Sequence, residues 1–85
     1  MAYRIELTPQ AAKQLATLER QTLKRIAARI DALAGDPRPA NARKLSAKEG
    51  LYRIRVGDYR VIYRIVDRMV LVTIIRIGHR RDVYR

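Results

Sequence analysis

Cysteine is absent from this sequence of 85 residues, and histidine occurs only once. Without cysteine the chain can form no disulfide bond, no thiolate metal site and no cysteine nucleophile, and a reducing cytoplasm is a permitted location. A lone histidine cannot build a metal site either. We therefore expect a cytoplasmic protein that uses no metal and no cofactor.

Long apolar runs, internal repeats and low-complexity tracts are also missing. No run approaches the roughly 18 apolar residues that a membrane-spanning helix needs. Residues 1–7 do not resemble a signal peptide, because no apolar region follows their charge. A chain of this length has room for one small core. The sequence therefore predicts a single domain over residues 1–85 that has no membrane partner.

Acidic residues are scarce, so the chain carries a net charge of +11. Residues 1–50 mix lysine with arginine, whereas residues 51–85 contain nine arginines, no lysine and three acidic residues. Arginine can bind a phosphate through two parallel hydrogen bonds, whereas lysine acts as a point charge. A polyanionic partner would relieve the self-repulsion of such a chain. The second half therefore favours RNA or DNA as a partner.

The first half of the chain predicts a short strand followed by two amphipathic helices. Alternation of apolar and charged residues indicates a strand over residues 3–7, and Thr8-Pro9 is typical of a helix start. We expect the helices over about residues 9–19 and 21–34, each with one apolar stripe. The apolar stripe of each helix must be buried against another apolar surface. We therefore expect the two helices to form a helical hairpin that packs on one face of a sheet.

Residues 51–66 alternate apolar side chains with arginine, which is typical of two strands with one buried face. Gly57-Asp58 fits a two-residue hairpin turn. The register that follows pairs Tyr52 with Tyr63, Arg53 with Ile62, Ile54 with Val61, Arg55 with Arg60 and Val56 with Tyr59. Directly paired residues share a face. One face is therefore apolar and available to the helices, and three arginines gather on the other.

Two further segments complete the expected sheet. Residues 36–50 are predicted to form a loop, with Leu45 plugging the edge of the core. Residues 69–77 are apolar at almost every position, which indicates an interior strand between the first strand and the second hairpin strand. The predicted fold is α/β in the α+β sense: an N-terminal strand, a helical hairpin and a three-stranded meander, forming a four-stranded antiparallel sheet with both helices on one face.

Following the chain up and down makes this last strand antiparallel to the first. A turn at residues 67–68 then places Ile75 beside Arg60 and Thr73 beside Ile62. The arginines would have an apolar floor, and a low dielectric constant strengthens the interactions of charges.

The last residues return to the arginine-bearing end of the hairpin, so His79, Arg80 and Tyr84 can reach the same face. Cations that stabilise charge developing on phosphorus are a sufficient catalytic device, and RNA supplies its own nucleophile in the 2′-OH. His79 and Tyr84 can move protons, and a tyrosine can also stack on an unpaired base. No pair of carboxylates is expected to face this cluster, and the sequence has no glycine-rich phosphate loop, so neither offers another chemistry.

The same residues also have a simpler interpretation. A basic sheet face can be solvated surface, a lone histidine is more often incidental, and a tyrosine in a chain tail often only packs. Arg64, Arg68 and Arg76 are predicted to lie away from the proposed face or in a turn, where solvation explains them.

Three stretches of the chain resemble the RelE/ParE superfamily of bacterial and archaeal toxins: residues 42–45, residues 51–63 with the motif Gly-Asp-Tyr-Arg-Val-Ile-Tyr, and residues 78–84 with the motif Gly-His-Arg-Arg-Asp-Val-Tyr. The resemblance covers essentially the whole chain. It implies a RelE-like toxin domain of a type II toxin–antitoxin pair and a cognate antitoxin that is acidic where it contacts the toxin.

For the RelE branch, the resemblance implies a metal-independent, ribosome-dependent endoribonuclease, also called an mRNA interferase. Such enzymes inhibit translation by cleaving mRNA in the A site. The 2′-OH attacks the phosphate and leaves a 2′,3′-cyclic phosphate and a 5′-OH. The implied partners are therefore mRNA, the ribosome and the antitoxin.

The resemblance also implies roles for individual residues. The family's basic residues before the hairpin turn match Arg53 and Arg55, and its arginine after the turn matches Arg60. Its arginine and tyrosine after the last strand match Arg80 and Tyr84. Arg60 and Arg80 would hold the scissile phosphate, and the two arginines before the turn would position neighbouring phosphates.

The proton acceptor stays open. Some RelE enzymes have lysines at the positions of Arg53 and Arg55, and arginine is a poor general base; His79 is our candidate, with Tyr84 as the other titrating group. The predicted catalytic residues are Arg60, Arg80, Tyr84 and His79. The predicted RNA-binding residues are Arg53, Arg55, Arg81 and Lys44.

Two other functions remain open at this point. The ParE branch shares the fold, poisons DNA gyrase through protein contacts and lacks the nuclease cluster. A non-catalytic RNA-binding module could use the same arginines. The arginines and the tyrosine that match the RelE pattern favour the RelE branch.

Overall fold

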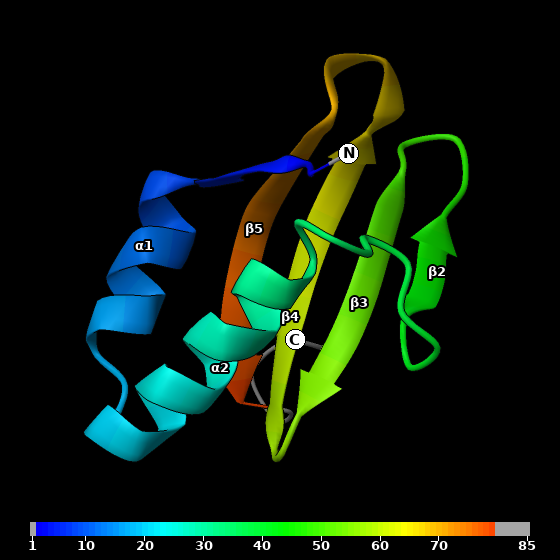
Figure 1. The fold of residues 1–85 in the computed structure, drawn as a ribbon. Coiled ribbons are helices and arrows are strands. Elements are labelled where there is room, and N and C mark those ends of the chain that lie inside the picture. Colours follow the sequence, from blue (N-terminus) through cyan, green and yellow to red (C-terminus); the bar gives the residue numbers. More distant parts are fainter. Residues whose placement is uncertain (1, 80–85) are drawn as a thin grey trace.

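The computed structural model describes residues 2–79, which form a sheet with two helices packed on one of its faces (Figure 1). No helix within these residues is long and apolar enough to cross a membrane. In chain order the elements are β1 (Arg4–Leu7), α1 (Pro9–Ala16), α2 (Arg20–Ala32), β2 (Arg43–Ser46), β3 (Leu51–Val56), β4 (Tyr59–Val66), the 3-10 turn η1 (Asp67–Met69) and β5 (Leu71–His79).

Both helices begin at capping residues that the local sequence supplies. The Thr8 hydroxyl accepts a hydrogen bond from the Ala11 amide at 3.1 Å, and Pro9 opens α1, as predicted. The Glu19 carboxylate caps α2 by accepting from the Gln21 amide at 3.1 Å. Because Glu19 belongs to this second cap, the first helix ends before the predicted residue 19.

The sheet has five strands in the order β1-β5-β4-β3-β2, and β1 runs parallel to β5. The predicted four-stranded antiparallel sheet is therefore wrong, although β5 does lie in the interior between β1 and β4, as expected. The difference comes from β2, which lies in the segment predicted to be a loop and pairs antiparallel with β3. This additional reversal of the chain turns β5 around relative to β1. Four residues without apolar alternation are too weak a pattern to indicate a strand.

The edge of the core near β2 also differs from the prediction. A bulge between Lys44 and Ser46 leaves Leu45 without an opposite residue in β3, and Leu45 is 46% exposed. The prediction that Leu45 plugs the core is therefore wrong. Ala42, just before the strand, packs against the core instead.

The β3–β4 hairpin has the predicted register at every pair from Tyr52–Tyr63 to Val56–Tyr59. Gly57 has a φ of 62°, a conformation that the first position of such a turn requires and that glycine adopts without steric cost. The apolar face of the hairpin is buried under the helices, and its core is formed by Ile54, Val56, Val61 and Tyr63 of the hairpin with Ile26, Ile30 and Leu33 of the α2 segment.

The β4–β5 register differs from the prediction by three positions. The turn is longer than two residues, because η1 and Val70 separate Val66 from its partner Leu71. A bulge between Ile62 and Tyr63 adds one further position. As a result Gly78, not Ile75, lies opposite Arg60, and the predicted apolar floor at that position is wrong.

Candidate functional site

The sheet face opposite the helices carries arginines from several strands, and we call it the arginine face. Arg55 of β3 lies opposite Arg60 of β4, as predicted. Arg53 and Arg60 are largely buried, with 6% and 9% of their surface exposed, whereas Arg55 is exposed. Like charges directly opposite one another repel. An anion in contact with these guanidinium groups would offset that repulsion.

A second row of residues crosses the same face. Arg43 of β2 lies opposite Arg53, Arg53 lies opposite Ile62, and Ile62 lies opposite Arg76 of β5. Opposite residues share a sheet face, so Arg43 and Arg76 belong to the arginine face. The sequence did not predict either one: Arg43 was not among the predicted site residues, and Arg76 was expected to lie away from this face or in a turn. Recognition of β2 and of the β4–β5 bulge would have been needed to find them.

A basic hollow opens at the β2 edge of this face, with a volume of about 560 Å³. Among residues 2–79, its lining contains four cationic side chains, one amide and no carboxylate. The lining residues are Ala40, Asn41, Ala42, Arg43, Lys44, Arg53 and Arg55. Neither Arg43 nor Arg55 forms an ion pair with any carboxylate of residues 2–79. The hollow is thus suited to an anion larger than a single phosphate.

Lys44, predicted to bind RNA, lines this hollow but lies opposite Tyr52 in the sheet register. Tyr52 belongs to the helix-facing side of the hairpin, so the Lys44 side chain belongs to the other side of the edge strand from Arg43. Both can border the hollow because β2 is the edge strand of the sheet that residues 2–79 form.

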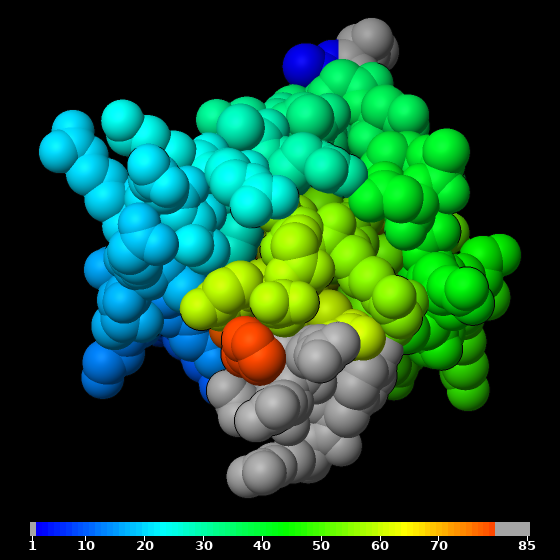
Figure 2. Space-filling model, turned by 90° about the horizontal axis from the view of Figure 1, so that it is seen from below, coloured from blue at the N-terminus to red at the C-terminus, as the bar shows by residue number. Residues whose placement is uncertain are grey.

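His79 ends β5 and lies opposite Tyr59, with the two ring centroids 5.5 Å apart and the ring planes nearly perpendicular. Figure 2 shows this end of the molecule, where the β3–β4 turn (yellow-green) lies between the helices (blue and cyan) and the end of β5 (orange-red). The register makes Gly78, rather than His79, the neighbour of Arg60. The role of His79 as a proton acceptor stays a prediction. Arg80, Arg81 and Tyr84 lie outside the described residues, and their roles also stay predictions.

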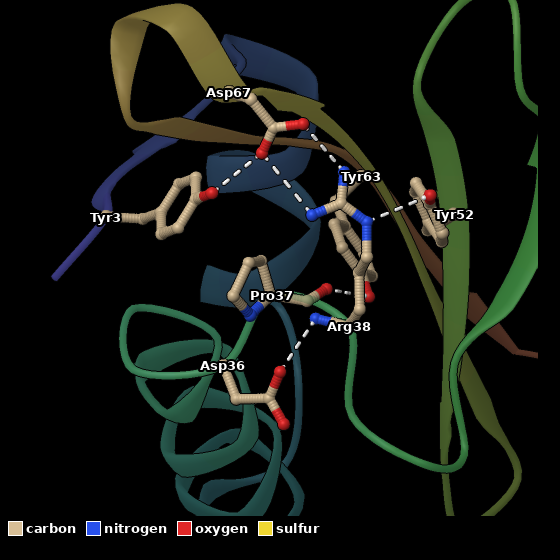
Figure 3. A network of polar contacts seen from close by, with 7 residues as sticks. All are labelled: Tyr3, Asp36, Pro37, Arg38, Tyr52, Tyr63 and Asp67. Carbon is tan, nitrogen blue, oxygen red and sulfur yellow. Dashed lines mark hydrogen bonds and ion pairs between the residues drawn. The ribbon is translucent and has the colours of Figure 1, made fainter. Parts of the chain in front are cut away.

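A polar network occupies the other end of the sheet, beside the β4–β5 turn (Figure 3). Asp67 accepts hydrogen bonds from the Tyr3 hydroxyl at 2.7 Å and from the Arg38 guanidinium at 2.8 and 3.3 Å. The Arg38 Nε donates to the Tyr52 hydroxyl at 3.1 Å, and the Tyr63 hydroxyl donates to the Pro37 carbonyl at 2.8 Å. These bonds tie the segment after α2 to β3, β4 and η1, and they tie Tyr3, which precedes β1, to η1.

The network shifts the pKa of its members. The hydrogen bonds from Arg38 and then from Tyr3 lower the pKa of the Asp67 carboxyl, and the bond to Asp67 raises the pKa of the Tyr3 hydroxyl. Burial raises the pKa of Tyr63 to about 12. At neutral pH the carboxylate is therefore ionised and both hydroxyls are protonated, which is the arrangement that their hydrogen bonds require.

Comparison with known proteins gives consistent matches over almost the whole chain. Residues 5–84 match the family described as ParE toxin of type II toxin-antitoxin system, parDE. Toxin RelG of Mycobacterium tuberculosis is 35% identical over 89 residues, which cover 100% of this chain and 99% of RelG.

Two solved complexes contain toxins of the same fold. The chain is similar to a chain of the archaeal RelE–RelB complex from Pyrococcus horikoshii OT3, with a TM-score of 0.86 and 31% sequence identity. The match covers 98% of this chain and 100% of the other chain. This chain also matches one from the intact E. coli RelBE toxin–antitoxin complex with a TM-score of 0.79 and 26% identity, over 92% and 96% of the two chains.

Proposed function

The chain belongs to the RelE/ParE superfamily of type II toxins, and from that premise we propose that it is a ribosome-dependent endoribonuclease that cleaves mRNA in the A site. The observation that carries the proposal is the placement of Arg55 opposite Arg60 on the sheet face that the helices leave open, with Arg53 on the same face. Cations fixed in this way can stabilise the charge that develops on a phosphate during cleavage.

In the proposed reaction, the RNA 2′-oxygen attacks the adjacent phosphorus and forms the new P–O bond. The bond from phosphorus to the 5′-oxygen of the next nucleotide breaks. A base takes the 2′-OH proton, and a donor supplies a proton to the leaving 5′-oxygen. The products are a 2′,3′-cyclic phosphate and a 5′-OH.

Arg60 is the described residue best placed to bind the reacting phosphate. It is largely buried, and its neighbour Gly78 contributes no side chain at the adjacent position of the face. A guanidinium held in this way needs little reorganisation when charge develops, which is the condition for electrostatic catalysis. Arg53 and Arg55 would position the neighbouring phosphates, and Arg80 would share the reacting one.

Two groups compete for the role of proton acceptor. His79 lies one position along β5 from the neighbour of Arg60, and Tyr84 is the second group that can titrate. Arginine remains a poor base because it keeps its proton at all working pH values. The pH dependence of cleavage by His79→Gln and Tyr84→Phe variants separates the two: the variant that lacks the base loses the rise of rate with pH.

The second proposed partner is a cognate antitoxin. The relatives from Pyrococcus horikoshii and E. coli were solved in complexes with RelB. A net charge of +11 favours an antitoxin that is acidic at the contact, because opposite potentials speed association and select the partner.

Primer extension on ribosome-bound mRNA tests the proposal. Wild-type protein should give cuts in the A-site codon with the ends described above, and Arg60→Ala should give none while keeping the thermal unfolding curve of a folded protein. Full-rate cleavage by Arg60→Ala would rule out its role.

The gyrase-poisoning alternative is favoured by the ParE description of the matching family. Protein-linked DNA breaks in the presence of gyrase, with no mRNA cleavage, would establish it in place of the nuclease. RNA binding with neither activity would leave a binding module.

A further inference from the structure

The basic hollow at the β2 edge is continuous with the proposed reaction site. Arg55 lines the hollow and also lies opposite Arg60. Arg53 lines the hollow too, and it lies about 7 Å from Arg55 along β3, the distance between residues two apart in a strand. An extended polyanion bound at Arg60 would therefore pass Arg55 and enter the hollow.

From this continuity we propose that the hollow is a subsite for a nucleotide that flanks the reacting phosphate of single-stranded RNA. Arg43 is the phosphate-binding residue that defines it. This inference rests on the proposed function, because the reacting phosphate is placed at Arg60.

The charges around the hollow fit this role. Arg43 is exposed, lies opposite Arg53 at about 5 Å between Cα atoms, and forms no ion pair with any carboxylate of residues 2–79. The part of the lining that the described residues supply includes Lys44 and no acidic residue. A phosphate between Arg43 and Arg53 would offset their mutual repulsion and could receive two parallel hydrogen bonds from the exposed guanidinium of Arg43.

The uncharged part of the lining fits a base. Asn41 presents an amide that can both donate to and accept from a base edge. Ala40 and Ala42 leave room beside it, and the volume of about 560 Å³ is ample for a base and its sugar. Recognition of unpaired RNA bases commonly combines contacts to base edges with backbone phosphate contacts.

An acidic protein segment fits the hollow less well. Protein partners bind mainly through large apolar or aromatic anchors in well-packed pockets. Within residues 2–79 the only apolar residues that line the hollow are two alanines, and the nearby exposed Leu45 does not line it. Phosphate contacts need no such anchor, so the lining favours RNA.

The Arg38–Asp67 network holds one end of the segment that borders the hollow. Pro37 and Arg38 are fixed to β4 and to Asp67, and the chain continues from there to the lining residues Ala40 to Ala42. The Ala42 amide donates to the Pro39 carbonyl at 2.9 Å, which closes a turn at this point. The rim of the subsite is thus built before RNA arrives, and ordering it on binding costs little.

The test uses the purified chain and a short single-stranded RNA in which one 2′-deoxy residue prevents cleavage. Affinity is measured by fluorescence anisotropy over a series of salt concentrations. Arg43→Gln should weaken binding about tenfold, as expected for loss of a charge-assisted hydrogen bond. It should also reduce the slope of log affinity against log salt by about 0.7, the value for one phosphate contact on a single strand.

Arg20→Gln is the matched control, because Arg20 is an exposed arginine in the helical layer and its loss changes the net charge equally. Its slope should equal that of the wild type. Equal reductions of slope in both variants would show a general charge effect and overturn the subsite.

Ala40→Leu tests the base-binding part without a change of charge. Ala40 is exposed, so the fold should tolerate the larger side chain. We expect severalfold weaker binding with an unchanged salt slope, because filling the hollow displaces the base and not the phosphate. A 4-thiouridine next to the 2′-deoxy residue should crosslink to the peptide that contains Asn41. Unchanged affinity for Ala40→Leu, or no crosslink, would overturn the base contact.

The outcomes separate this inference from the proposed function. Wild-type protein that binds the RNA with the expected Arg43 dependence but never cleaves mRNA on ribosomes would sink the nuclease proposal and leave the subsite. Normal cleavage with an unaltered slope in Arg43→Gln would sink the subsite alone. Binding of an acidic peptide in the hollow, with no binding of RNA, would overturn the choice of RNA as its ligand.

Discussion

At the β4–β5 end of the sheet, Arg38 bonds a carboxylate and a tyrosine hydroxyl, whereas at the β3–β4 end Arg55 lies directly opposite another arginine. The first arrangement matches each charge with a partner of the same chain. The second concentrates like charge on an open face. Arginine thus stabilises the fold where a carboxylate lies next to it, as at Arg38. At the exposed positions Arg43 and Arg55, which pair with no carboxylate of residues 2–79, arginine is available to bind a ligand.

The largest expected effect separates activity from stability at the two ends. Arg60→Gln should lower the rate of mRNA cleavage on ribosomes about 10² to 10³-fold, since it removes a fixed cation that stabilises transition-state charge. Arg38→Gln should leave that rate within a few-fold of the wild type. Single-turnover cleavage checks both, with thermal unfolding as the control for folding. Equal losses of activity in the two variants would contradict the assignment of a catalytic role to the β3–β4 end and a structural role to the β4–β5 end.

The next effect concerns Tyr63 at the structural end. Its pKa in the folded chain is about 12, above the ordinary value near 10, so the folded state holds the hydroxyl proton more tightly than the unfolded state does. The stability from this group is complete below about pH 10 and is lost as the pH rises toward 12. We expect a loss of about 2 kcal/mol from this group over that interval.

Tyr63→Phe provides the comparison for that prediction. The variant should be less stable at neutral pH by about 1 kcal/mol, because the Pro37 carbonyl loses its donor. Its stability should decline less steeply between pH 10 and 12 in urea unfolding. Parallel curves for the variant and the wild type would show that another group causes the alkaline loss.

A smaller effect is expected from the ion pair itself. Arg38 and Asp67 are partly exposed, with 44% and 59% of their side-chain surface accessible, so solvent screens their attraction. Arg38→Gln and Asp67→Asn should each lower stability slightly, and the double variant should lower it by less than the sum. A double-mutant cycle in low and high salt measures this coupling, which should shrink as salt is added. If the two losses of stability are strictly additive, the Arg38–Asp67 ion pair does not stabilise this end of the sheet.

The smallest effect is the acid dependence of Asp67. Its pKa is lowered in the folded chain by Arg38 and Tyr3, so the unfolded state binds its proton more readily. The stability it contributes is present above the ordinary carboxyl pKa and is lost as the pH falls through the lowered value. Asp67→Asn should therefore show a shallower loss of stability in acid than the wild type. If the stability of the variant falls with acid pH as steeply as that of the wild type, Asp67 does not contribute to the acid dependence.

The hairpin and its arginines could be predicted because local chemistry fixes them. Period-2 alternation and a glycine at a two-residue turn determine which residues share a face, and Arg55 and Arg60 lie opposite each other as expected. The buried helix stripe and the interior place of β5 follow from apolar patterning in the same way.

The parts that could not be predicted depend on irregular backbone. Val70 adopts a φ of 50°, which a β-branched residue rarely does, and it lengthens the turn before β5. The bulge at Ile62 and the short strand β2 leave no pattern in the sequence either. An error in register changes the predicted partner of every later residue in the strand. The predicted pairing of β4 with β5 therefore left Arg76 off the arginine face and gave Arg60 the wrong neighbour.

The parallel pairing of β1 with β5 joins residues that are far apart in the chain, Arg4 with Leu71. Closing so long a loop has an entropic cost, and contacts of this kind slow folding. Arg76 and Gly78 reach the arginine face only when β5 inserts between β1 and β4. During synthesis the hairpin can form first, while β1 waits for a partner that has not yet been made. The topology therefore makes the complete arginine face one of the last features that a newly made chain acquires.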